Sequence, residues 1–232
     1  MFRSRVSRVV MTLVLGLQAC ALAAIASEQP APVMASISGN PTPSGTPQTA
    51  VLAGGCFWGT QGVFEHVKGV RQVLAGYSGG EKATAEYGKV GTGTTGHAES
   101  IQITFDPAVV SYADILQVFF SVAHNPTELN RQGPDVGTQY RSEIFFADAS
   151  QQKTALAYIA QLEQAHVFRA PIATRVDPLT GFYPAEAYHQ DFLFKNPRYS
   201  YIVFNDLPKI ANLKRQFPKI YVDTPVLVAA AR

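Results

Sequence analysis

The sequence predicts an α+β fold in which helices cover a mixed sheet as a two-layer sandwich. Three observations carry this prediction. Short apolar strand patterns alternate with helical patterns along the chain. Three stretches without apolar periodicity, 78–96, 124–139 and 178–200, are long enough to line a site in a compact domain. Hydrophobic residues make up 47% and charged residues 16% of the 232 residues, which excludes a disordered chain and a polytopic membrane protein.

The predicted elements follow one another in a strand–helix order. Ile101, Ile103 and Phe105 alternate with polar residues, which is typical of a half-buried strand. Ser111 and Asp114 have the spacing of a capping box, which predicts a helix start. We expect strands at 49–53, 70–77, 101–105, 144–146 and 172–176, and helices at 56–67, 111–120 and 150–165.

The N-terminal residues 1–27 resemble an export signal. Three arginines precede an apolar stretch at 9–26, and small residues follow that suit cleavage. The stretch is 18 residues long, so an uncleaved membrane anchor is an alternative. The tetrapeptide Leu-Gln-Ala-Cys at 17–20 is similar to a bacterial lipobox, which makes lipidation at Cys20 a third possibility. Under each of these three interpretations the working domain is exported, and we expect it in the periplasm or elsewhere outside the cytoplasm.

The next segment, 28–48, contains five prolines among small and polar residues and is predicted to be a linker. The compact domain is expected at 49–220, with a C-terminal tail at 221–232. Without the three N-terminal arginines, 16 basic residues face 17 acidic ones, and this near-neutral body argues against nucleic acid as a partner. The two cysteines exclude a disulfide-stapled fold, because Cys20 lies in the apolar N-terminal run.

Three patterns suggest chemistry that the rest of the sequence does not support. Residues 91–96 match the Gly-x-Gly-x-x-Gly dinucleotide fingerprint, but a strand pattern follows where a helix is needed, so we expect a flexible loop. The five histidines form no helical pair with metal-ligand spacing, so we expect no metal and no other bound cofactor. The basic residues near the end are predicted to form a solvated helix face: Lys209, Lys214, Arg215 and Lys219.

The most informative segment is Gly-Gly-Cys-Phe-Trp-Gly at 54–59. Two glycines allow a sharp turn out of the preceding strand, and Cys56 then falls at the start of a helix. Free N–H groups and the helix dipole at that position stabilise a thiolate, which predicts a lowered pKa for Cys56. A buried, inert cysteine is the alternative. The glycines on both sides and Trp58, the only tryptophan, favour a nucleophile.

The Gly-Cys-Phe-Trp-Gly segment resembles the active-site signature of the A-type peptide methionine sulfoxide reductases. Further matching segments occur in the same order over residues 50–205. They are Gly-Tyr-Ser-Gly-Gly at 76–80, Thr-Gly-His-Ala-Glu at 95–99, His-Asn-Pro-Thr at 124–127, Gly-Thr-Gln-Tyr-Arg-Ser at 137–142, Ala-Glu at 185–186 and His-Gln at 189–190. The resemblance implies an oxidoreductase with a ferredoxin-like core and long active-site loops, which reduces methionine S-sulfoxide and so repairs proteins after oxidative stress.

The resemblance also assigns roles to residues. It implies that the Cys56 thiolate attacks the sulfoxide sulfur and becomes a sulfenic acid. It places the acid at Glu99, which donates near neutral pH only if an apolar setting raises its pKa. It further implies an oxygen-binding wall of Tyr87, Asp135 and Tyr140, and an apolar surface of Phe57 and Trp58 against the S-methyl group.

One departure from many relatives concerns recycling of the oxidised thiol. Members of the family often carry resolving cysteines, commonly after a Lys-Asn-Pro segment near the C-terminus. Here 195–197 is Lys-Asn-Pro and no cysteine follows, and Gly91 stands where some members have one. The expected reductant is therefore an external thiol, such as a thioredoxin-like protein or dithiothreitol. The expected substrates are oxidised proteins, peptides and free methionine sulfoxide. We expect the protein to be a monomer. It is expected to contact a membrane only if Cys20 is lipidated or the signal is not cleaved.

Two other classes stay open on the residues alone. A cysteine hydrolase or transpeptidase could pair Cys56 with His97 or His189. A non-catalytic module could hold methionine-like ligands in an aromatic pocket. Three outcomes distinguish these classes. Reduction of a sulfoxide peptide indicates the reductase, cleavage of an ester or amide indicates the hydrolase or transpeptidase, and binding without turnover indicates the non-catalytic module.

Overall fold

The computed structural model describes residues 46–228. The predicted signal at 1–27, Cys20, most of the linker at 28–48 and the last residues of the tail lie outside the described residues. Within 46–228, no helix is both long and apolar enough to cross a bilayer.

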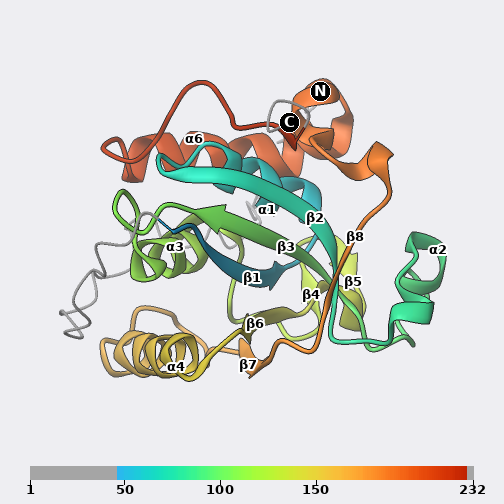
Figure 1. Cartoon of the computed structure of the whole chain (residues 1–232), viewed down its shortest axis with the longest axis horizontal. Coiled ribbons are helices and arrows are strands. Elements are labelled where there is room, and N and C mark those ends of the chain that lie inside the picture. The colour runs from blue at the N-terminus through green and yellow to red at the C-terminus, as the bar shows by residue number, and fades with distance from the viewer. Residues whose placement is uncertain (1–45, 229–232) are drawn as a thin grey trace, which may run out of the picture.

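A six-stranded sheet forms the centre of the fold (Figure 1). Its strands are β1 (Gln48–Gly54), β2 (Val70–Ser78), β3 (Ala98–Phe105), β6 (Ser142–Phe146), β7 (Arg175–Pro178) and β8 (Phe182–Pro184). They lie in the order β7-β6-β1-β3-β2-β8, and β6 and β7 are the one parallel pair among them. The short strands β4 (Arg131–Gln132) and β5 (Asp135–Val136) form a separate hairpin. The predicted mixed sheet is confirmed.

The ferredoxin-like core is also confirmed. The chain runs through β1, α1 (Phe57–Glu65), β2, β3, α3 (Tyr112–Val118) and β6. The four strands lie in the order β6-β1-β3-β2 with antiparallel neighbours, as this β-α-β-β-α-β arrangement requires. The arrangement places the C-terminal end of β1 and the first turn of α1 beside the N-terminal end of β3, where the site lies.

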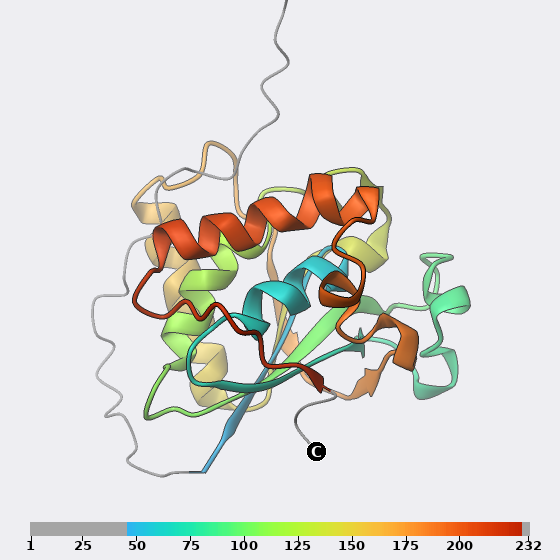
Figure 2. The same ribbon diagram turned by 90° about the horizontal axis from the view of Figure 1, so that it is seen from above.

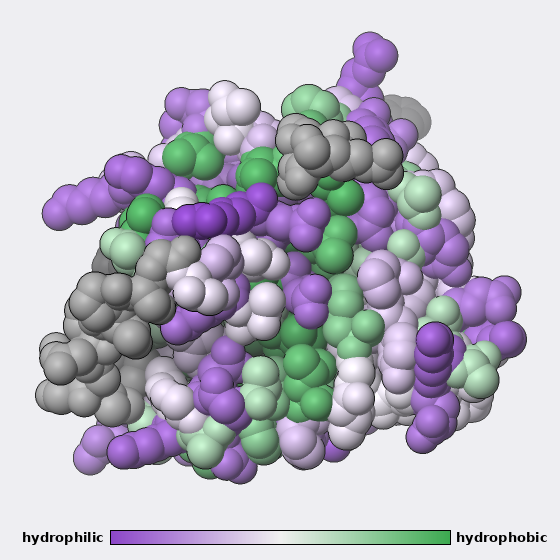
Figure 3. Space-filling model, viewed as in Figure 1, coloured by the Kyte–Doolittle hydropathy of each residue, from purple (hydrophilic) through white to green (hydrophobic). Residues whose placement is uncertain are grey.

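The longer helices, α1, α3, α4 (Ala149–Gln164) and α6 (Leu207–Gln216), pack on one face of the sheet and give the two predicted layers. The short helix α5 (Phe192–Lys195) contacts α1, and α2 (Tyr87–Val90) lies to the side of the sheet in Figure 1. Figure 2 shows α1 and α6 stacked over the same face of the strands, and Phe64, Leu116 and Leu213 share one core with Ile103. The opposite face holds a smaller cluster of Val51, Ala53, Ala98 and Phe145 with Leu179 and Phe182. Apolar side chains gather on that side in Figure 3, below the centre of the view.

Local sequence signals account for most element boundaries. Ser111 and Asp114 form the predicted capping box, with both reciprocal hydrogen bonds present. The strand predicted at 172–176 is displaced to 175–178, because Ala173 donates its N–H to the Pro126 carbonyl instead of joining the sheet. The three predicted loops contain short elements that the sequence does not reveal. These are α2, β4, β5, β8, α5, the 3₁₀ turns Lys82–Thr84 and Ala187–His189, and most of the 3₁₀ turn Thr138–Tyr140.

Residues 221–228, the described part of the predicted tail, lie along α1. Tyr221 forms a bridge with Val67, and the N–H groups of Val222 and Val226 donate to the carbonyls of His66 and Glu65. The N–H of Val228 donates to Asp191 Oδ1 at 3.0 Å. This segment therefore covers the end of α1 that is remote from Cys56.

Candidate active site

Cys56 lies where β1 turns into α1. Gly55 has φ +85°, and a Cβ there would collide with the Gln132 side chain, so this position requires glycine. Cys56 is the N-cap of α1, one position before the predicted first turn, and is partly exposed. The glycine turn thus places the thiol at the N-terminal end of the helix.

Glu99 approaches the same helix end from β3. The N–H of Phe57 donates to Glu99 Oε2 at 3.1 Å, and no side chain of α1 caps its own N-terminus. Glu99 therefore satisfies an amide that would otherwise be unpaired. The carboxyl is 3% exposed. Burial raises its pKa to about 8, against the lowering effect of the Phe57 N–H, and Asp135 raises it further. At neutral pH Glu99 carries a proton, as the sequence argument required.

The predicted lowered pKa of Cys56 is wrong. Desolvation raises the pKa of the thiol well above its ordinary value, and the carboxylates of Glu99 and Asp206 add to the rise. The Trp58 N–H and Lys209 act in the opposite direction. The helix-end effect predicted from the sequence is present, but burial between two carboxyl groups outweighs it.

The three residues of the polar wall expected around the thiol come from different elements. Tyr87 begins α2, Asp135 begins β5, and Tyr140 ends a 3₁₀ turn. The pKa values of both tyrosines are raised, first by burial and then by Glu99, with Cys56 contributing, so these groups lie near one another. Asp135 accepts a hydrogen bond from the hydroxyl of Tyr201, which sequence reasoning missed.

The apolar side of the site is an aromatic cluster. The Phe57 ring is 1% exposed and packs on Tyr77 and His189, so its visible role is in the core. Trp58 is partly exposed and stacks on Phe192, with ring centroids 3.8 Å apart. Its indole N–H donates to His189 Nδ1 at 3.0 Å, which fixes the ring.

His189 and Glu186 position this cluster. The sequence offered a signal for both, since they belong to the Ala-Glu and His-Gln segments of the resemblance. Glu186 accepts from the Tyr87 N–H and the Tyr77 hydroxyl, both at 2.9 Å, and so joins α2 to the sheet. His189 is buried with a lowered pKa, mainly through desolvation, and is therefore a neutral hydrogen-bond acceptor for Trp58.

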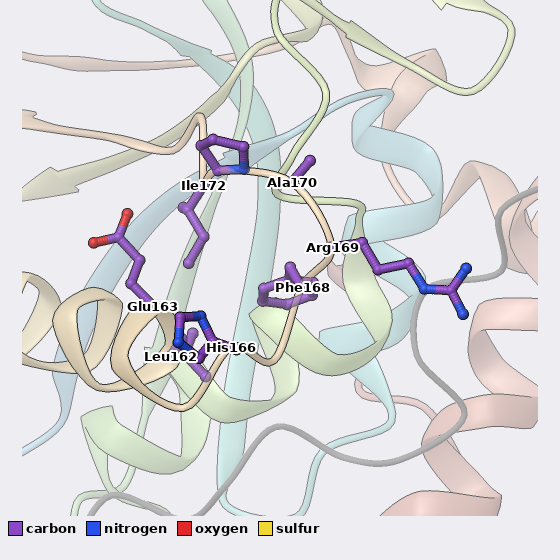
Figure 4. Close-up of a pocket in the computed structure, with 8 residues that line it drawn as sticks. Leu162, Glu163, His166, Phe168, Arg169, Ala170 and Ile172 are labelled. Atoms are coloured by element: carbon purple, nitrogen blue, oxygen red, sulfur yellow. The ribbon is translucent and has the colours of Figure 1, made fainter.

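The two clearest hollows in the described part of the chain lie elsewhere. The one in Figure 4 is at the C-terminal end of α4, with His166, Phe168 and Ile172 turned inward and Arg169 pointing away. The second lies beside Arg141 and Arg175. Neither is lined by Cys56 or Glu99.

The structure also tests the other patterns that the sequence analysis considered. Residues 91–96 follow helix α2 and precede strand β3, the reverse of a dinucleotide fold. Within 46–228 no group of His, Cys, Asp or Glu has a metal-binding arrangement. Lys209 departs from the predicted solvated face, because its ammonium donates to the buried Asp206 at 3.1 Å. Sequence reasoning missed that partner, which lies three residues earlier and is 0% exposed.

The raised pKa of Glu99 predicts a stability effect. Below about pH 4.5 the carboxyl is protonated in both folded and unfolded chains. Between that pH and about 8 only the unfolded chain loses the proton, so the wild type loses stability that Glu99→Gln retains. The free energy of unfolding of Glu99→Gln should exceed that of the wild type by about 3–5 kcal/mol above pH 8. Urea unfolding at several pH values measures it, and a pH-independent difference would contradict the buried, protonated carboxyl.

Comparison with known proteins identifies the class. The family model described as peptide methionine sulfoxide reductase matches residues 48–220. Peptide methionine sulfoxide reductase MsrA 2 of Mesorhizobium japonicum is 60% identical over 184 residues, which cover 79% of this chain and 94% of that protein. The protein of the same name from Synechocystis is 53% identical over 170 residues, covering 73% and 79%.

Solved structures agree. Mxr1 from Saccharomyces cerevisiae in reduced form has a TM-score of 0.61 and 33% identity, covering 66% of this chain and 87% of that one. Methionine sulfoxide reductase A of Corynebacterium diphtheriae has a TM-score of 0.57 and 34% identity, covering 73% and 82%. The fold and site define a thiol oxidoreductase. The chain belongs to the peptide methionine sulfoxide reductase family, whose members reduce methionine sulfoxide at the expense of a thiol.

Proposed function

We propose that Cys56 is the nucleophile of a reductase that acts on methionine S-sulfoxide, in proteins, peptides and the free amino acid. The observation that carries the assignment is the pairing at the start of α1. There a thiol adjoins a carboxyl group that is protonated at neutral pH and held by the Phe57 N–H. Both chemical requirements of sulfoxide reduction, a nucleophile for sulfur and a proton for oxygen, meet at one helix end.

In the proposed reaction the Cys56 sulfur attacks the sulfoxide sulfur while Glu99 protonates the sulfoxide oxygen. The sulfur–sulfur bond formed in this attack and the S–O bond of the substrate then break as the hydroxyl oxygen bonds to the Cys56 sulfur, so Cys56 becomes a sulfenic acid and methionine leaves as the thioether. Glu99 recovers a proton from the Cys56 thiol, so thiol plus sulfoxide give sulfenic acid plus thioether without an outside proton. The Phe57 N–H occupies one carboxyl oxygen and leaves the other for this transfer. Tyr87 and Tyr140, whose pKa values are raised, stay neutral and donate hydrogen bonds to the oxygen.

Recognition of the S-methyl group falls to Trp58. Trp58→Ala should lower kcat/KM for a sulfoxide peptide by about 10- to 100-fold, because it removes the partly exposed apolar surface next to the thiol. Phe204→Ala is the matched control, since that ring is 77% exposed. Steady-state kinetics measures both, and equal effects of the two substitutions would refute a recognition role for Trp58.

Recycling of the sulfenic acid requires thiols from outside. Cys56 is the only cysteine among residues 46–228. One external thiol forms a mixed disulfide with the Cys56 sulfur and releases water, and a second thiol then frees Cys56. A thioredoxin-like protein fits this role because the Cys56 side chain is partly exposed. We place the enzyme, as a monomer, outside the cytoplasm, on the N-terminal signal pattern. Intact mass of the exported protein distinguishes cleavage, retention of the signal and lipidation at Cys20.

The test is an assay with separated sulfoxide epimers of a methionine peptide in the presence of dithiothreitol. The expected result is reduction of the S epimer alone. Reduction of the R epimer alone would overturn the epimer assignment. Cleavage of an ester or amide without reduction would identify a hydrolase, and saturable binding without turnover a methionine-binding module.

A further inference from the structure

A buried ion pair lies behind the thiol, at the junction of the π turn Ile202–Asp206 and α6. Asp206 is 0% exposed, and its Oδ1 accepts from Lys209 Nζ at 3.1 Å. The Lys209 side chain is 22% exposed, so most of it is withdrawn from water. Asp206 Oδ2 is buried without a hydrogen-bond partner. A buried carboxylate with one orphaned oxygen is costly, which calls for a reason beyond packing.

The pair touches the first turn of α1. Gly59 follows Cys56 by three residues and so lies on the same side of the helix. A Cβ at Gly59 would overlap Asp206 Oδ1 and lie 2.9 Å from Lys209 Nζ. Glycine at this position therefore brings both charges against the helix turn that carries the thiol.

Several titratable groups face Cys56 from the surrounding elements. Glu99 comes from β3, Tyr87 from α2, Tyr140 from a 3₁₀ turn and Tyr201 from the residue before the π turn, and Asp135 from β5 lies beside Glu99 and Tyr201. Glu99 is protonated at neutral pH, and the tyrosines are neutral because their pKa values are raised. Lys209 is the cation among these neighbours, and it lowers the pKa of Cys56, whereas Asp206 raises it.

We propose that Asp206 and Lys209 are positioning residues for the nucleophile: Lys209 supplies the positive charge that stabilises the developing thiolate, and Asp206 holds that ammonium against the first turn of α1. This inference rests on the proposed role of Cys56. The arrangement supplies, from the C-terminal helix, a counter-charge in a site where burial and the Asp206 carboxylate oppose ionisation of the thiol at neutral pH.

Substitution of Lys209 and substitution of Asp206 should shift the pKa of the Cys56 thiol in opposite directions. Lys209→Met leaves Asp206 unpaired and should slow alkylation of Cys56 by iodoacetamide at neutral pH by about tenfold, the change in thiolate fraction for one pKa unit. Asp206→Asn removes the anion but keeps an oxygen that accepts from Lys209, and should speed alkylation. Lys209→Arg should restore a rate near that of the wild type. Lys214→Met is the control, because Lys214 pairs with Asp223 on the surface of the same helix.

The experiment measures the rate of alkylation of Cys56 against pH in the folded, full-length chain, with peptide mapping to exclude Cys20. A slower alkylation of Cys56 in Lys209→Met together with a faster alkylation in Asp206→Asn supports the proposal. Shifts in the same direction, or none, overturn it, because loss of packing alone would expose the thiol in both variants. If Lys209→Met does not fold, Lys209→Gln takes its place, and an alkylation rate no slower than that of the wild type then contradicts the proposal. This experiment does not measure reductase activity. Whether Cys56 is the nucleophile is tested separately, by the reductase activity of Cys56→Ser.

Discussion

Replacement of Cys56 by serine is expected to abolish sulfoxide reduction and leave the fold unchanged. Serine keeps the volume of the side chain and is a favoured N-cap, so α1 should form as before. A hydroxyl is far less acidic and less nucleophilic than a thiol, so attack on the sulfoxide sulfur should stop. Turnover of a methionine-sulfoxide peptide with dithiothreitol measures the loss, and circular dichroism checks the fold.

Cys20→Ser is the matched control for this prediction. It removes the other cysteine of the chain and should leave reduction unchanged. Retention of a tenth of wild-type turnover in Cys56→Ser, or loss of activity in Cys20→Ser, is incompatible with Cys56 as the sole nucleophile.

Glu99→Gln is expected to slow the chemical step by about 10²- to 10⁴-fold, which is the usual contribution of a positioned acid. Glutamine retains an oxygen that can accept from the Phe57 N–H, so the helix end stays satisfied. It has no carboxyl proton to transfer. Single-turnover formation of methionine isolates this step from recycling.

Glu86→Gln is the control, because Glu86 pairs with Lys89 at the surface. It should leave the single-turnover rate unchanged. An unchanged rate in Glu99→Gln would reduce Glu99 to a structural cap of α1. Together with the stability measurement, this pair of results separates the two roles, since the gain in stability depends on burial and the loss of rate depends on the proton.

Much of the fold follows from local sequence. The alternation at 101–105 and the Ser111–Asp114 pair each predict an element that the structure contains, because these signals act within a few residues. β8 carries no comparable signal. It has three residues and exists because it pairs with the edge of β2, a contact that the local pattern does not encode.

The candidate site likewise has some features that local sequence predicts and others that depend on distant residues. The position of Cys56 at a helix start is a local property, and the hexapeptide predicts it to within one residue. Its pKa is raised mainly by burial, and Glu99 and Asp206, which arrive from β3 and from the end of the π turn, add to the rise. No local pattern reveals that other segments bury the thiol or that two carboxyl groups meet there, and this is why the predicted direction of the shift was wrong. Tyr201 and the effect of Lys209 on Cys56 were missed for the same reason, since each acts on a residue far away in the sequence.

The most direct test of the single-cysteine account is the mass of the exported protein after treatment with one equivalent of a methionine-sulfoxide peptide and no added thiol. The account predicts one equivalent of methionine and a gain of one oxygen on the chain. It also predicts that dimedone reacts with the sulfenic acid at Cys56. Loss of two hydrogens from a monomer, without the added oxygen, would instead show a disulfide between Cys20 and Cys56 and contradict recycling by an external thiol.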